Sequence, residues 1–112
     1  MRKKEEIKQL LNKIENLDWT VTEEGYSQYL LSQFSPAEQD FNIVIEGKNV
    51  EELLESIYQA YENYDVSEET YLWLDNTGHG KNGAPYELED VLEDMKWCKN
   101  VILELYKNLT SE

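Results

Sequence analysis

This sequence of 112 residues has few of the side chains that usually build metal or disulfide centres. It contains one cysteine, Cys98, and one histidine, His79. A lone cysteine cannot form a disulfide within the chain, so a reducing cytoplasm is the expected compartment. Zinc sites are built mainly from several Cys and His ligands, and this chain has too few of either. We therefore expect no metal site and no disulfide framework.

Long apolar runs are also missing. No stretch approaches the roughly 18 apolar residues of a membrane-spanning helix, and the N-terminal Met-Arg-Lys-Lys-Glu-Glu-Ile lacks the apolar region of a secretory signal. We expect no contact with a membrane. Apolar residues nevertheless make up 40% of the chain, with eight Tyr and three Trp, and this content excludes a disordered chain. The length predicts one domain over residues 1–112.

Basic residues are scarce, so negative charge dominates. The chain has 24 Asp and Glu against 10 Lys and Arg, a formal net charge of −14. The excess is uneven, because residues 49–112 hold 15 acids and 4 bases. Such a charge repels nucleic acids, nucleotides and anionic membranes, and it favours a basic protein partner. Composition alone leaves open that the acids only keep the protein soluble.

The period of the apolar residues changes along the first half of the chain. Apolar residues three and four apart predict an amphipathic helix over residues 3–17. From Trp19 the period is two, and it predicts three strands, at about residues 19–22, 26–34 and 41–46. Because short turns join these strands, an antiparallel meander is expected.

Two helices are predicted in the second half, with an ambiguous segment between them. Asn49 is expected to cap a helix that runs to about Tyr64, and an apolar stripe predicts a last helix over residues 88–109. In the segment 68–74, Ser67-Glu-Glu is typical of a helix start, whereas Thr70-Tyr-Leu-Trp-Leu is typical of a strand. We expect a strand or a short irregular segment there.

The predicted fold class is α+β, with the order α-β-β-β-α-α and helices packed on one face of a three-stranded antiparallel meander. The α-β-β-β-α part matches the order of double-stranded RNA-binding domains, which work through basic residues. The corresponding second helix here is rich in Glu, so RNA binding is excluded on charge.

The glycine-rich residues 75–85 contain Gly78-His-Gly-Lys-Asn-Gly83, which spells G-x-G-x-x-G. A dinucleotide site needs this motif within a βαβ unit, and only a helix follows it here. A calcium loop that starts at Asp75 would place Thr, His and Tyr where oxygen ligands are required. His79 could act as a base beside Asp75, but no nucleophile is spaced with them. We expect a turn-forming segment, with no catalytic residue and no cofactor; its role stays open.

Two rows of acids on the predicted helices are the strongest functional signal. Carboxylates one helical turn apart lie about 6 Å from each other, and phosphates along one DNA strand advance about 3.4 Å per nucleotide. Such rows approximate alternate phosphates, which a basic groove would accept. The candidate partner-binding residues are Glu51, Glu52, Glu55, Glu62, Asp90, Glu93, Trp97 and Glu104.

The last helix also carries one aromatic residue off its apolar stripe. At 100° per residue, Trp97 falls on the far side, near the acids of its row. It is expected either to be covered by another element or to contact a partner. Cys98 lies within the stripe and is expected to be an inert core thiol.

Two segments resemble a known group of proteins. Phe34-Ser-Pro-Ala-Glu-Gln-Asp-Phe41 and Trp73…Gly80-Lys-Asn-Gly-Ala-Pro85, followed by an acidic last helix, are similar to small acidic proteins of bacterial mobile elements and prophages. This setting, with the size and charge, resembles that of anti-CRISPR and anti-restriction inhibitors, several of which imitate DNA. The resemblance covers residues 18–109. The chain departs from the group at Glu38, where glycine is usual, and at His79, where arginine is usual.

The resemblance implies an accessory protein of a mobile element. With the charge, it favours an acidic inhibitory protein that occupies the basic nucleic-acid groove of a defence nuclease, either a type II CRISPR effector or a restriction nuclease. The protein itself would bind no nucleic acid and would not be an enzyme. The alternative is an acidic adaptor or a homo-oligomerising structural protein, with Trp97 in a homodimer interface. An enzyme that uses Asp75 and His79 is a third hypothesis.

Overall fold

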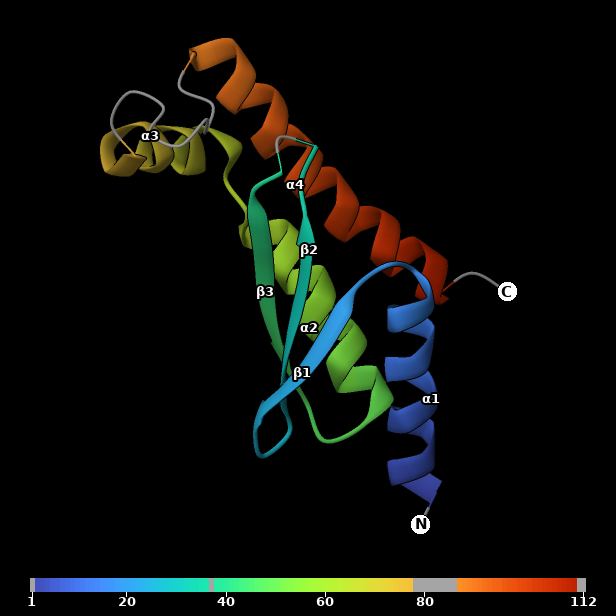
Figure 1. Cartoon of the computed structure of the whole chain (residues 1–112). Coiled ribbons are helices and arrows are strands. Elements are labelled where there is room, and N and C mark those ends of the chain that lie inside the picture. The colour runs from blue at the N-terminus through green and yellow to red at the C-terminus, as the bar shows by residue number, and fades with distance from the viewer. Residues whose placement is uncertain (1, 37, 78–86, 111–112) are drawn as a thin grey trace.

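The computed structural model describes residues 2–36, 38–77 and 87–110. These residues form an N-terminal helix, a three-stranded antiparallel sheet and then three helices, so the predicted α+β class and the order of its elements are confirmed (Figure 1). The elements are α1 (Arg2–Asn16), β1 (Thr20–Gly25), β2 (Gln28–Phe34), β3 (Asp40–Glu46), α2 (Val50–Asn63), α3 (Val66–Thr77) and α4 (Leu88–Thr110).

The sheet is a meander in the order β1-β2-β3. Leu31 at its centre pairs with Val21 on β1 and with Ile43 on β3. Because side chains alternate along a strand, Leu31, Ile43 and Ile45 point to one face and are buried there. The opposite face carries residues such as Val44, which is 52% exposed.

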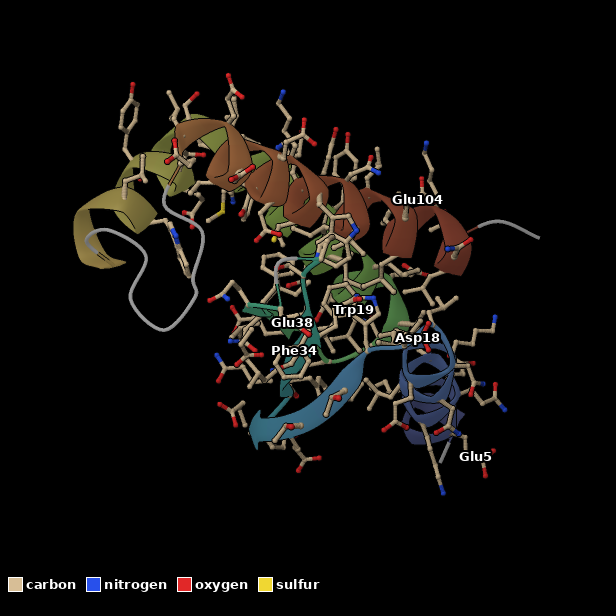
Figure 2. All side chains as sticks on the ribbon, turned by 45° about the horizontal axis from the view of Figure 1, so that its top comes forward. Glu5, Asp18, Trp19, Phe34, Glu38 and Glu104 are labelled. Atoms are coloured by element: carbon tan, nitrogen blue, oxygen red, sulfur yellow. The ribbon has the colours of Figure 1, made fainter. Side chains whose placement is uncertain are left out.

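The helices cover only the buried face of the sheet. Figure 1 shows α2 behind the strands, α4 running alongside α2 and past the end of the sheet, and α1 beside β1 near one end of the molecule. Trp19 lies between the sheet and the helices, where it is 4% exposed (Figure 2). Fully burying one such apolar side chain stabilises a fold by about 1.5–3 kcal/mol. The core consists of Leu10, Ile14, Trp19, Tyr29, Leu31, Ile43, Ile45, Leu53, Ile57, Ile102, Leu105 and Leu109.

Helix α2 begins as its sequence predicts. The side chain of Asn49 accepts a hydrogen bond from Glu52 N at 2.9 Å, and the Glu52 carboxylate accepts one from Lys48 N at 2.7 Å. This reciprocal arrangement satisfies donors at the helix start. Gly47 is required before it, because a Cβ at this position would lie 2.7 Å from the Cβ of Glu52.

The prediction of a strand or irregular segment over residues 68–74 was wrong, since these residues lie within α3. Asp65 caps this helix by accepting a hydrogen bond from Glu68 N at 3.0 Å. The Thr70 hydroxyl donates to Val66 O at 2.7 Å, so it is satisfied although Thr70 is 2% exposed. Capping and packing against α4 therefore outweigh the strand propensity of this β-branched and aromatic segment.

The molecule is elongated, with extents of 51 × 25 × 21 Å. Helix α3 and the first turns of α4 pack against each other beyond the end of the sheet (Figure 1). No helix in the described ranges is long and apolar enough to cross a membrane.

Candidate functional site

The acids of α2 form one exposed row. Glu51, Glu55 and Glu62 are all exposed, and at 100° per residue they fall within about 40° of one another around the helix. They lie opposite the fully buried Leu53 and Ile57. Glu52 is exposed as well, but it lies to one side of the row, and its carboxylate takes part in the start of α2.

The acids of α4 form a second exposed row. Asp90, Glu93 and Glu104 are exposed, and Trp97, which shares their side of the helix, is half-buried. Figure 2 shows Glu104 on the outer side of α4. The Trp97 side chain is therefore partly shielded from solvent and partly accessible to a partner.

The two rows are separate edges of the helical layer. Tyr58 of α2 and Tyr106 of α4 lie with ring centroids 5.1 Å apart, which identifies the side of α4 that meets α2. Glu104 comes two residues before Tyr106, so it lies about 160° further round the helix. The row on α4 therefore faces away from α2, so the two rows do not merge into one.

Among the described side chains, residues 5–36, 38–74 and 87–110, no close ion pair joins a Lys to any of the seven candidate acids. On α4, however, Lys96 and Lys107 each lie one turn from an acid of the row, Glu93 and Glu104, and lower its net charge. The Glu55 carboxylate accepts a hydrogen bond from the uncharged amide of Gln59, Nε2, at 3.0 Å. Lys99 donates instead to the carbonyl oxygens of Tyr61 and Tyr64, both at 2.6 Å. The surplus charge of these rows therefore faces solvent.

A pocket of about 450 Å³ lies where the end of α2 meets β3, α3 and α4. Its walls combine aromatic rings with carboxylates, and the sequence analysis did not foresee it. Among the residues that line it are Ser35, Phe41, Tyr64, Glu69, Trp73 and Asp94.

Asp94 connects the pocket wall to the turn between β2 and β3. It is 7% exposed, and one of its carboxylate oxygens accepts a hydrogen bond from the Ser35 hydroxyl at 2.9 Å. Ser35 Oγ in turn accepts a hydrogen bond from Gln39 N at 3.2 Å. Asp94 comes three residues after Val91 and four before Cys98, so it lies on the apolar stripe of α4. This position in the sequence already indicates a buried acid.

Tyr64 and Cys98 sit beside these acids. Burial first, and the charge of Asp94 second, raise the pKa of the Cys98 thiol to about 12. The pKa of the Tyr64 phenol is raised well above its usual range, first by burial and then by Cys98, Glu69 and Asp94. The Tyr64 hydroxyl lies 3.1 Å from Met95 Sδ. Cys98 is thus a buried, protonated thiol, as expected.

The raised thiol pKa predicts a loss of stability in alkali. In the unfolded chain Cys98 loses its proton near its ordinary pKa of 9.0, whereas the folded chain keeps it to about pH 12. The unfolded state therefore binds fewer protons between these values, and the free energy of unfolding falls as pH rises. At pH 10.5 we expect Cys98 to account for a loss of up to about 2 kcal/mol. Urea unfolding at pH 8.0 and 10.5 measures it, and Cys98→Ala should lose correspondingly less; equal losses would contradict the assignment.

The described residues do not support the remaining hypotheses from the sequence, a site in the glycine-rich segment and a metal site. Residues 78–86, with His79 and most of the glycine-rich segment, lie outside the described residues, as does the side chain of Asp75. Among the described residues, no group of three or more His, Cys, Asp or Glu side chains is arranged to hold a metal ion. Comparison with known proteins gives no family model, no curated protein and no solved structure that matches this chain.

Proposed function

We propose that this protein is an acidic binding protein that inhibits a nucleic-acid-processing enzyme by occupying its basic groove. The observation that carries the proposal is the exposed row of Glu51, Glu55 and Glu62, with which no described lysine forms an ion pair. A rigid helix holds these charges in place, because its opposite face is anchored in the core. Fixed charges of one sign are suited to a complementary surface of the other sign.

The spacing of the charges supports imitation of a nucleic acid. From Glu51 to Glu62 the helix advances about 16 Å, which corresponds to about five phosphates of one strand. The row on α4 forms a second line of charge, on the side of that helix turned away from α2. Two separated rows therefore correspond better to the two backbones of a duplex than to one strand.

The target that we propose is a bacterial defence nuclease, because the sequence resembles small acidic proteins of mobile elements. A guide-loaded type II CRISPR effector has a positively charged channel of the required kind, and restriction nucleases also bind duplex DNA. In this role the acids of both rows contact basic side chains, and the exposed part of Trp97 adds an apolar contact.

A pull-down and cleavage assay tests the proposal. Guide-loaded CRISPR nucleases and restriction nucleases are incubated with the protein at 50 and 500 mM salt, and DNA cleavage is measured. We expect at least one nuclease to be captured and inhibited at low salt, with weaker inhibition at high salt because exposed charges are screened. Nucleases that all cleave normally and fail to bind would refute the proposal.

The adaptor or homo-oligomer remains the second candidate. The open face of the sheet favours it, because Val44 is 52% exposed there and Phe34 at the end of β2 is 70% exposed. Light scattering separates the two candidates. An oligomer that persists at 500 mM salt, together with a negative nuclease assay, would support self-association.

A further inference from the structure

The pocket behind β3 has the size of a ligand site. Its volume of about 450 Å³ falls in the lower half of the range of small-molecule pockets, about 300–1,000 Å³. It opens where four elements meet, so parts of the chain that are distant in sequence contribute to it, including Phe41, Tyr64, Glu69 and Asp94. The space suits one long side chain better than a folded segment.

Three aromatic residues line this pocket. Phe41 and Tyr64 pack edge to face, with ring centroids 5.8 Å apart and an interplanar angle of 86°. Trp73 of α3, which is half-buried, also lines the pocket. The faces of aromatic rings carry partial negative charge and attract cations, and Trp does so most strongly.

The pocket also holds a surplus of negative charge. Asp94 is fixed in the wall by Ser35, and the half-buried Glu69 lies nearby. Both carboxylates contribute to the raised pKa values of Tyr64 and Cys98, which line the same pocket. Among the described residues that line the pocket there is no Lys or Arg.

The nearest lysine of α4 is directed elsewhere. Lys99 follows Cys98 in sequence, but its ammonium group donates to the backbone carbonyls at the end of α2 and lies 4.4 Å from the centre of the Tyr61 ring. It stabilises the end of a helix. The described lining of the pocket therefore combines aromatic rings and carboxylates, a chemistry that suits a cationic side chain.

We infer that the pocket receives one arginine side chain of the basic partner. This inference rests on the proposed function, because it names the contact by which an acidic protein would anchor a basic surface. The planar guanidinium can stack on an aromatic ring while it donates two hydrogen bonds to a carboxylate, whereas the lysine ammonium can do only part of this. Arg and aromatic residues are also frequent at the energetic centre of interfaces.

The direct test uses N-acetyl-L-arginine amide as the probe and needs no partner protein. The probe is titrated into the isotope-labelled protein, and the indole resonance of Trp73, assigned with Trp73→Phe, is followed by NMR. We expect a saturable shift of this resonance with a Kd on the order of millimolar, as suits a ligand of so few atoms. The uncharged isostere N-acetyl-L-citrulline amide should give no saturable shift.

A pair of variants tests the role of the pocket charge. Glu69→Gln removes one negative charge from the pocket, and Glu15→Gln removes one from an exposed position on α1. We expect the first variant to weaken the binding of the probe at least about threefold, which is somewhat under 1 kcal/mol, and the second to change it little. Equal effects of the two variants would overturn the inference. So would equal binding of the arginine and citrulline probes to the unmodified chain, a comparison that does not depend on any variant.

The outcomes separate this inference from the proposed function. A captured nuclease without a Trp73 shift would refute the arginine pocket and leave the acidic rows as the interface. A specific shift with a negative nuclease assay would support a cation-binding pocket and refute the proposed class of target.

Discussion

Replacing Glu51, Glu55 and Glu62 together by lysine is expected to weaken binding to the basic partner by about 100-fold or more. Each exposed ion pair contributes about 0.2–1 kcal/mol, and reversal replaces an attraction by a repulsion of similar size. Each of the three reversals loses one attraction and gains one repulsion, so the six contributions sum to several kcal/mol at most. A difference of 1.4 kcal/mol corresponds to a tenfold change in affinity. The fold should tolerate the change, because all three side chains are exposed and Lys has a helix propensity close to that of Glu. Biolayer interferometry against a nuclease captured in the pull-down measures the effect.

A matched triple variant controls for net charge. Glu5, Glu15 and Glu23 are exposed on α1 and β1, and their reversal to lysine changes the net charge of the protein by the same amount. If the row on α2 is the contact, this control should lose much less affinity. If both triple variants lose the same affinity, overall charge is responsible and the row has no special part.

Lys99→Met is expected to lower the free energy of unfolding by about 2–3 kcal/mol. Helix α2 has no basic residue in its last turn, and Lys99 supplies that charge from α4 through two hydrogen bonds of 2.6 Å. A hydrogen bond to a charged group is worth about 1.5–3 kcal/mol, and a cation at a helix C-terminus adds to this. Methionine keeps most of the apolar stem but leaves both carbonyls without this donor. Urea unfolding at pH 7 provides the measurement.

The control is Lys107→Met, in the last turn of the same helix, where the lysine is exposed. Its effect should stay within about 0.5 kcal/mol, as for most surface substitutions. A loss at Lys99 as small as that at Lys107 would show that the two hydrogen bonds add nothing to stability.

Local signals were sufficient to predict most of the fold. The change from helical to alternating period after residue 17 located the sheet, and Asn49 marked the start of α2 within one residue. The segment of α3 was misassigned because Thr70 and the aromatic residues after it have strand propensity. Its cap, Asp65, directly follows the predicted end of the preceding helix at Tyr64, so the two helices are joined with almost no linker. The decisive contact, packing against α4, involves residues about 20 positions further along the chain.

The candidate site could be predicted only in part. The outward direction of the two acidic rows follows from helical geometry, and the structure shows these acids exposed. Their separation depends on which side of α4 meets α2, and a single sequence does not contain that information. The pocket depends on Ser35 and Asp94, which are 59 residues apart. In the sequence, Ser35 is only the residue that follows the predicted strand 26–34.

The order β1-β2-β3 leaves one long edge on each outer strand of the described sheet. Unpaired edges invite intermolecular strand pairing, and charged side chains are a common protection against it. Glu23 and Glu24 stand on β1, and Asp40 and Glu46 on β3. The net negative charge of the whole protein, which also opposes association, vanishes near the isoelectric point of about 4.3. Precipitation in mildly acidic buffers is the practical consequence, so purification and storage belong at neutral pH.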